Sequence, residues 1–175
     1  AVTFHAEGSK IGAQCTTSTT PTEAGVCNVT FTSQAFRPTD GRISILAMAI
    51  GEESFADGNG NGAFDPGETL YDTSEPFEDD NESGAYNSGE FFYDFNNDGA
   101  RNGPDGMFNG VLCNDPARCS GPKSAGIGVS NLIILSGSNP QITLPSGAAV
   151  PATDTIALSS ARAYTFWVRD VNNNP

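Results

Sequence analysis

The chain has 175 residues, a length that suits one domain with a real apolar core, and a formal net charge of −13 at pH 7. Fifteen Asp or Glu residues and one Arg lie between Glu52 and Asp105, whereas the rest of the chain carries six acidic and seven basic residues. The negative charge is therefore confined to one insertion. Because nucleic acids and anionic membranes need a basic face, this distribution argues against both as partners and favours cations.

Short segments rich in β-branched and aromatic residues, separated by Gly, Pro, Asn and Ser, predict an all-β fold. In chain order, the predicted strands cover residues 2–5, 26–32, 43–50, 129–135, 141–144 and 164–171. No window of about 12 residues or more has convincing helical periodicity. Strands of this kind are typical of a β-sandwich, and we expect Trp167 in the last strand to lie in its core.

Four cysteines form two pairs that are close in sequence, Cys15 with Cys27 and Cys113 with Cys119. They lack the CxxC and His spacing of a zinc site. We expect disulfides within each pair, although four cysteines permit three connectivities. The alternative is four free thiols in a cytosolic protein. Disulfides imply an oxidising compartment.

Membrane and export signals are not found in this segment. No apolar stretch approaches the roughly 20 residues of a membrane helix, so we expect no membrane insertion. Residues 1–10 lack the basic and apolar regions of a signal peptide, and an export signal is expected upstream of Ala1.

Residues 55–109 differ from the rest because they are dense in Gly, Asn, Asp and Glu and poor in Val, Ile and Leu. We expect this segment to lack an apolar core of its own. A disordered acidic linker is one interpretation. Regularly placed aromatic residues argue against it and indicate that bound ions fold the segment. These residues are Phe55, Phe64, Phe77, Tyr86, Phe91, Phe92, Tyr93 and Phe108.

A calcium-binding loop of twelve residues has oxygen ligands at positions 1, 3 and 5 and a Gly at position 6. A main-chain carbonyl follows at position 7, a polar group at 9 and an acid at 12. The segment 57–68, DGNGNGAFDPGE, meets every requirement. Its predicted ligands are Asp57, Asn59, Asn61, the carbonyl of Ala63, Asp65 and Glu68.

Two further segments repeat the pattern. In 79–90, DDNESGAYNSGE, the predicted ligands are Asp79, Asn81, Ser83, the carbonyl of Ala85, Asn87 and Glu90. In 94–105, DFNNDGARNGPD, they are Asp94, Asn96, Asp98, the carbonyl of Ala100, Asn102 and Asp105. Because Asp105 is short for bidentate contact, the third site is expected to be the weakest or to use other ligands, such as Asn97 or a carbonyl near Met107. Three tandem matches predict two to three bound Ca²⁺ ions.

An enzymatic function is not expected. His5 is the only histidine, and in a predicted strand it is interpreted as a structural residue rather than a catalyst. No Ser-His-Asp or Cys-His arrangement is recognisable. A glycosidase pair among the acids is the alternative, but calcium-ligand spacing explains these acids better.

Both ends of the chain resemble one family. Residues 164–175, YTFWVRDVNNNP, are similar to the strand and D-x-N-x-N-P turn that open a bacterial Ig-like repeat of the invasin and intimin type (group 1). Residues 1–5, AVTFH, resemble the strand that follows that turn, and 26–50 are similar to the middle of the repeat, with its T-D-G turn at 39–41. The acidic insertion is absent from the simplest members. It is similar to the EF-hand-like calcium loops of dockerins and thrombospondin-like repeats.

The resemblance implies a single Ig-like β-sandwich domain over 1–175, one repeat period long, with a calcium-binding insertion at 52–110. Such repeats occur in tandem on large secreted and cell-surface bacterial proteins, so neighbouring Ig-like repeats are the implied partners and the location is extracellular. The expected function is a structural module of an adhesin or exoprotein that calcium rigidifies. The alternative is a calcium-dependent recognition module for a cell-surface glycan or protein.

Overall fold

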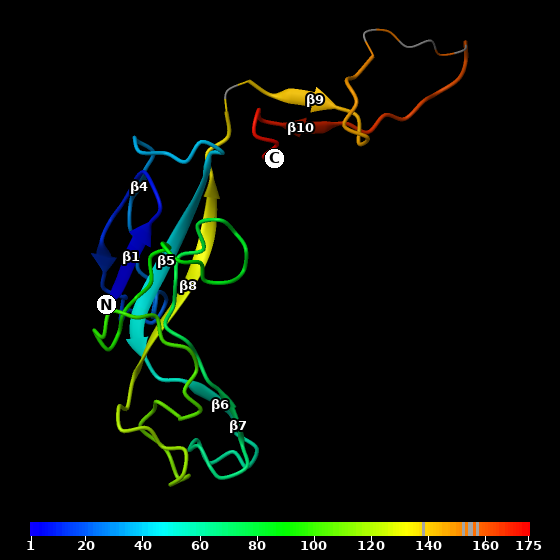
Figure 1. Ribbon diagram of the computed structural model, residues 1–175. Helices are drawn as coiled ribbons and strands as arrows, with labels where there is room; N and C mark the ends of the chain where they lie inside the picture. The colour runs from blue at the N-terminus through cyan, green and yellow to red at the C-terminus, as the bar shows by residue number, and fades with distance from the viewer. Residues whose placement is uncertain (138, 152, 154–155, 157) are drawn as a thin grey trace. The chain divides into compact units, whose positions relative to one another are not determined.

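The computed structural model describes residues 1–137, 139–151, 153, 156 and 158–175. These residues contain ten strands and no helix, which confirms the predicted all-β class. The strands are β1 (Val2–Ala6), β2 (Lys10–Ile11), β3 (Gln14–Cys15), β4 (Phe31–Thr32), β5 (Arg42–Gly51), β6 (Ser54–Ala56), β7 (Thr69–Tyr71), β8 (Ala125–Ile134), β9 (Gln141–Thr143) and β10 (Trp167–Arg169). Figure 1 shows their arrangement.

The chain divides into two compact units. The first comprises Ala1–Arg37 and Ile43–Ile133, and the second comprises Pro38–Arg42 and Ile134–Pro175. The acidic insertion lies entirely within the first unit.

A four-stranded sheet in the order β3-β1-β5-β8 forms the scaffold of the first unit. β1 pairs antiparallel with β5 from Val2 opposite Ala49 to Ala6 opposite Ile45, and the arrows of β5 and β8 run in opposite directions in Figure 1. β5 supplies the buried apolar side chains of this sheet, which are Ile43, Leu46 and Met48. Its run of Ile, Leu, Met and Ala explains this, since such residues suit a strand with buried side chains.

The predicted strand 26–32 is wrong over most of its length, since only Phe31–Thr32 forms a strand, β4, which pairs with β2. The preceding backbone is used in a turn, in which Val26 donates to the carbonyl of Glu23 and accepts from the amide of Ser18. These hydrogen bonds and the neighbouring Cys15–Cys27 disulfide keep the segment out of a ladder. Both predicted disulfides are confirmed, the second being Cys113–Cys119.

The acidic insertion has its own small apolar core, contrary to the expectation from its composition. Phe64 and Phe108 are 0% and 2% exposed, and both contact Phe55, with ring centroids 5.6 and 5.3 Å away. Three aromatic rings compensate for the scarcity of Val, Ile and Leu because each buries a large apolar area.

In the second unit, β9 and β10 form a two-stranded antiparallel sheet, with Trp167 opposite Thr143. Trp167 is 40% exposed, so its predicted core position is wrong. A two-stranded sheet buries little, and the guanidinium of Arg169 covers the ring of Trp167 at 4.3 Å. The predicted turn after β10 is held by Asp170, which accepts the backbone amides of Asn172 and Asn174 at 2.9 Å.

Candidate metal centres

The first predicted loop folds around the carboxylate of Asp57. Its Oδ1 atom accepts the amide hydrogens of Gly60 and Asn61 at 2.7 and 3.2 Å, and its Oδ2 atom accepts that of Gly62 at 2.8 Å. Gly62 has a φ of 76°, a left-handed conformation that side chains with a Cβ disfavour. The acid at position 1 and the glycine at position 6 are therefore joined directly.

The acid at position 12 closes the same loop. Glu68 accepts the amide hydrogen of Gly58, at position 2, through Oε1 at 2.8 Å. It accepts that of Asp65, at position 9, through Oε2 at 2.9 Å. One carboxylate thus holds the beginning and the end of the loop together, and we name this set of loop residues site 1.

The second loop forms site 2 in the same way. Asp79 accepts the amide hydrogens of Ser83 and Gly84, each at 2.9 Å, and Glu90 Oε2 accepts that of Asn87 at 2.7 Å. Glu90 Oε1 is buried, and no hydrogen bond reaches it from the residues that the structure describes. Because a buried carboxylate oxygen without a partner is costly, a cation at this loop would fit the donor set.

The third loop, site 3, begins like the other two. Asp94 Oδ1 accepts the amide hydrogen of Asp98 at 3.1 Å, and its Oδ2 accepts that of Gly99 at 2.8 Å. Gly99 has a φ of 80°, which repeats the turn seen at the same position of sites 1 and 2.

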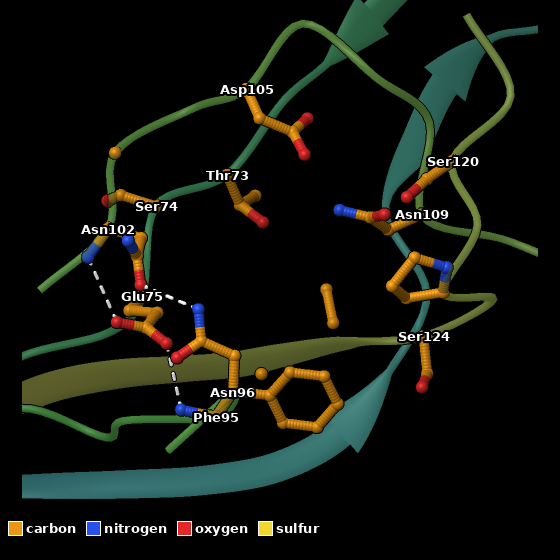
Figure 2. A pocket seen from close by; sticks show the side chains of 14 residues that line it. Thr73, Ser74, Glu75, Phe95, Asn96, Asn102, Asp105, Asn109, Ser120 and Ser124 are labelled. Carbon is orange, nitrogen blue, oxygen red and sulfur yellow. Dashed lines mark hydrogen bonds between the residues drawn. The ribbon is translucent and has the colours of Figure 1, made fainter. Parts of the chain in front are cut away.

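Site 3 is closed by Glu75, a residue outside the predicted loop. Its Oε1 accepts the amide hydrogen of Phe95, at position 2, at 2.8 Å, and its Oε2 accepts that of Asn102, at position 9, at 3.0 Å (Figure 2). These are the two hydrogen bonds that Glu68 makes in site 1. The position-12 role assigned to Asp105 by the sequence is therefore filled by Glu75.

Asp105 instead belongs to a fourth arrangement, which we name site 4. Asp72 accepts the amide hydrogens of Asp105 and Gly106, as a position-1 acid does from positions 5 and 6. Asp105 Oδ1 accepts the amide hydrogen of Met107 at 2.7 Å, and Gly106 has a φ of 79°. Asp105 thus occupies position 5, not position 12.

Glu53 completes site 4. Its Oε1 accepts the amide hydrogen of Thr73, the residue after the position-1 acid, at 2.9 Å. Its Oε2 accepts that of Asn109, at position 9, also at 2.9 Å. Site 4 is therefore assembled from three separate segments, near residues 53, 72 and 105–109.

An internal repeat of 22 residues explains these assignments. Residues 53–72 and 75–94 align without a gap and are identical at ten of 20 positions. Each repeat has four of these acids, in the order Glu, Asp, Glu, Asp. The two inner ones close the loop between them, and they are Asp57 with Glu68 in site 1 and Asp79 with Glu90 in site 2. The two outer acids, the first Glu and the last Asp, close a later segment and form sites 4 and 3. Each of these four acids is used in one site only.

Short antiparallel pairings connect the sites in two pairs. β6 lies between Glu53 of site 4 and Asp57 of site 1, and β7 lies between Glu68 of site 1 and Asp72 of site 4. The two strands pair with Phe55 opposite Leu70. In the second repeat, Phe77 and Phe92 form the equivalent antiparallel bridge between sites 2 and 3.

The aromatic residues at position 8 of sites 1 and 4 pack against each other. They are Phe64 and Phe108, whose ring centroids are 5.2 Å apart. Phe64 forms a parallel bridge with Cys113, and Phe108 forms one with Cys119. The Cys113–Cys119 disulfide therefore links the two backbone segments that hold these loops.

Arg101 is the position-8 residue of site 3 and contacts site 2. Its guanidinium lies 4.7 Å from the ring centroid of Phe77 and 5.1 Å from that of Tyr86. It also donates to the carbonyl of Glu75 at 3.0 Å and to Ser74 Oγ at 2.7 Å. Arg101 thus packs sites 2 and 3 against each other and fixes the backbone of the residue that closes site 3.

Hydrogen bonding keeps two of the loop acids ionised. Side-chain amides of Asn59, Asn114 and Asn61 donate to Asp65 and lower its pKa. A backbone amide does the same for the pKa of Asp98. Ionised carboxylates are the state that a hard divalent cation requires.

Across the described residues, no three side chains of His, Cys, Asp or Glu are gathered into a metal-binding group. Calcium loops can also take oxygen ligands from Asn, Ser and main-chain carbonyls.

No family model matches the chain, and no curated protein or solved structure is significantly similar to it. The part of the chain that the structure describes contains no helix able to cross a membrane.

Sequence reasoning missed the roles of Glu53, Asp72 and Glu75. A signal for them exists, because a Glu stands four residues before the first acid of each predicted loop, as Glu53 does before Asp57. The same spacing precedes Asp72, where no contiguous loop follows.

Proposed function

We propose that this chain is a calcium-binding structural module of a secreted or cell-surface bacterial protein, with an Ig-like scaffold whose acidic insertion is rigidified by Ca²⁺. Sites 1 to 4 would each bind one ion. Two disulfides support an oxidising, extracellular compartment. The resemblance of the chain ends to Ig-like repeats supports a place beside further repeats in the parent protein.

One observation carries the calcium proposal. In four places, an Asp accepts the backbone amides of positions 5 and 6, and a Glu accepts that of position 9. Each of the four sites therefore contains one Asp and one Glu in the same arrangement around the backbone. Clusters of hard oxygen ligands of this kind favour Ca²⁺ over softer metals.

Charge and energy also support a structural role. The insertion carries fifteen acidic residues and one Arg. The negative charges of the acids repel one another in a compact volume. Each ion bound at about 100 times its dissociation constant would add roughly 2.7 kcal/mol to the free energy of unfolding. Several such ions would rival the typical stability of a domain, about 5 to 15 kcal/mol.

A calcium titration by calorimetry, paired with thermal unfolding in chelator and in millimolar Ca²⁺, tests the proposal. We expect several bound ions and a large rise in Tm. Glu68→Gln provides the site-specific control, because it should remove the ion of site 1 and leave the sheet of β1, β5 and β8 folded. Absence of binding together with an unchanged Tm would reject the calcium function.

Calcium-dependent recognition of a glycan or protein is the second candidate. A cavity of about 370 Å³ lies beside sites 3 and 4, lined by Asn96, Asn102, Asp105 and Asn109 and by the ring of Phe95 (Figure 2). Amide and carboxylate groups around an aromatic ring suit a polar ligand such as a sugar. An ion with an open coordination position at this cavity would add a further contact.

A glycan array separates the two candidates. Binding that requires Ca²⁺ and is lost in Ser124→Ala, a residue that lines the cavity but belongs to none of the four sites, with the Tm in calcium unchanged, would favour recognition. Absence of any calcium-dependent glycan signal would favour the structural role.

A further inference from the structure

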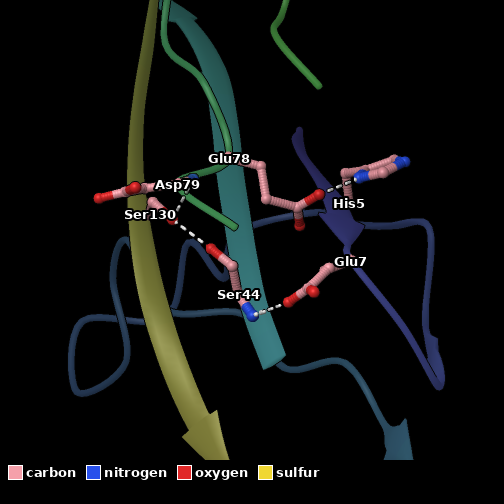
Figure 3. A network of polar contacts seen from close by, with 6 residues as sticks. All are labelled: His5, Glu7, Ser44, Glu78, Asp79 and Ser130. Atoms are coloured by element: carbon pink, nitrogen blue, oxygen red, sulfur yellow. Dashed lines mark hydrogen bonds and ion pairs between the residues drawn. The ribbon is translucent and has the colours of Figure 1, made fainter. Parts of the chain in front are cut away.

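Site 2 is fastened to the four-stranded sheet through its first acid and the residue before it. The backbone amide of Asp79 donates to Ser130 Oγ in β8 at 3.4 Å, and Ser130 Oγ lies 2.7 Å from Ser44 Oγ in β5 (Figure 3). Glu78 Oε2 lies 2.8 Å from Nδ1 of His5 in β1. Three strands of the scaffold therefore help to hold site 2.

Sites 1 and 4 are supported by a short loop that a disulfide closes. This loop is CNDPARC, residues 113–119, and the Cα atoms of Cys113 and Cys119 at its ends are 5.8 Å apart. Inside the loop, Asp115 is 7% exposed, and its carbonyl accepts the amide hydrogens of Arg118 and Cys119 at 3.0 and 2.9 Å. The disulfide and these hydrogen bonds give the loop a defined shape, and we name it the clamp loop.

The clamp loop contacts site 1 at three positions. Asn114 donates its backbone amide hydrogen to the carbonyl of Phe64, at position 8, at 2.8 Å, and its side-chain amide donates to Asp65 Oδ1, at position 9, at 2.9 Å. Arg118 Nη1 donates to the carbonyl of Glu68, at position 12, at 3.4 Å. The Arg118 guanidinium also lies 5.0 Å from the ring centroid of Phe64. The second half of site 1 is therefore held by this loop.

The same loop contacts site 4. The carbonyl of Arg118 accepts the amide hydrogen of Phe108, at position 8, at 2.7 Å. Arg118 Nε donates to the carbonyl of Gly106, at position 6, at 3.4 Å. Ser120, directly after the disulfide, donates its amide hydrogen to the carbonyl of Phe108 at 3.0 Å. One arginine thus holds the backbone of both sites, with Nη1 on site 1 and Nε on site 4.

We propose that the clamp loop couples calcium binding at sites 1 and 4, with Asn114 and Arg118 as positioning residues. The inference rests on the proposed calcium function and adds cooperativity to it. Because the loop contacts both sites, a loop arrangement that suits one occupied site is already in place for the other, and this effect is reciprocal. Loss of such outer contacts commonly lowers metal affinity by about 10- to 100-fold.

A chain in which only sites 1 and 4 bind isolates the coupling. Glu75→Gln with Glu90→Gln provides this background, because these residues close sites 3 and 2. Adding Glu53→Gln or Glu68→Gln then leaves site 1 or site 4 alone. Calcium titrations of these three full chains give the coupling factor, which is the overall binding constant for both ions divided by the product of the two single-site constants.

We expect a coupling factor of about 10. Arg118→Met in the same chains keeps an apolar stem over Phe64 but removes both side-chain hydrogen bonds, so the factor should fall close to one. Sites 2 and 3 are the matched control, because no hydrogen bond runs to them from the clamp loop within the described chain. In a chain with Glu53→Gln and Glu68→Gln, which keeps only those two sites, Arg118→Met should leave calcium affinity unchanged.

A coupling factor near one before Arg118 is changed would overturn this inference alone. Equal weakening of all four sites by Arg118→Met would also overturn it, because a general loss of stability would then explain the effect. A wild-type chain without bound calcium would overturn the proposed function as well. If the paired variants do not fold, the two disulfides of the wild type decide the question.

Coupling is reciprocal, so bound calcium should also favour the disulfide that closes the clamp loop. Dithiothreitol reduces a disulfide by giving it two electrons and two protons, and it is itself oxidised to a cyclic disulfide. At a fixed ratio of reduced to oxidised dithiothreitol, calcium should shift Cys113–Cys119 toward the disulfide by about 10-fold and Cys15–Cys27 much less. Thiol alkylation and peptide mass spectrometry measure both, and equal shifts would reject the coupling.

Discussion

The carboxylate of Glu75 accepts the amide hydrogen of Asn102 at 3.0 Å, although 27 residues separate them in the chain. This contact assigns Glu75 to the same site as Asp94, and it leaves Asp105 to site 4 with Asp72. Pairs of substitutions can test that division, because two changes in one site remove one ion whereas changes in two sites remove two.

We expect Glu75→Gln with Asp94→Asn to lower the number of bound Ca²⁺ ions by one, since both residues serve site 3. Glu75→Gln with Asp105→Asn should lower it by two. Calorimetric stoichiometry at saturating Ca²⁺ measures the difference. If Asp94→Asn with Asp105→Asn removed a single ion, the contiguous loop read from the sequence would be right and the division described here would be wrong.

Phe64 should be the most costly side chain of the insertion to truncate. It is fully buried between Phe55 and Phe108, so Phe64→Ala is expected to lower the free energy of unfolding by about 3 to 5 kcal/mol. Leu112→Ala is the control and should cost much less, because Leu112 accepts the backbone amide hydrogen of Phe64 at 2.8 Å but is 59% exposed. Denaturant unfolding in calcium compares them, and equal losses would mean that the aromatic cluster is not a core.

Arg101 should stabilise the contact between sites 2 and 3. Arg101→Met keeps an apolar stem over Phe77 and Tyr86 but removes the charge and both hydrogen bonds. A loss of about 1 to 3 kcal/mol in the free energy of unfolding is expected. Arg37→Met, at an exposed position, should be nearly neutral. Thermal melts in excess calcium provide the comparison, and matching Tm values would contradict the role of Arg101.

Glu78 should make the calcium-free protein less stable as the pH rises. Burial raises its pKa to about 8 from an ordinary value of 4.5. Between these values the folded chain retains a proton that the unfolded chain has released, so the free energy of unfolding falls with rising pH across this window. In chelator, the Tm of the wild type should therefore fall more steeply between about pH 5 and 8 than that of Glu78→Gln. Parallel curves would assign Glu78 an ordinary pKa.

The sequence was informative where structure depends on local spacing. The apolar run of β5 and the close cysteine pairs led to a strand and two disulfides that the structure contains. The hydrogen bonds within the loops that begin at Asp57 and Asp79 also follow from spacing, because a carboxylate can cap amides four and five residues ahead.

The remaining assignments depend on contacts between distant segments. A twelve-residue template places the last acid of site 3 at Asp105, whereas the folded chain supplies Glu75 from the preceding repeat. The apolar core of the insertion could not be predicted from composition, because Phe64 and Phe108 lie in a polar sequence. They are buried where their backbone pairs with Cys113 and Cys119. Trp167 was misplaced because a hydrophobic pattern does not reveal how many strands will cover it.

The acids of the four sites pair with residues at different distances along the chain. This difference sets the order in which the sites can form as the chain is synthesised. Sites 1 and 2 are contiguous, so each is complete once Glu68 or Glu90 has emerged. Site 3 must wait for Asn102, and Glu53, the first acid of the series, finds its last partner only when Asn109 arrives. A chain that stops before residue 109 therefore lacks the residue that Glu53 contacts last, and site 4 cannot form. The insertion can be completed only after the whole segment has been synthesised.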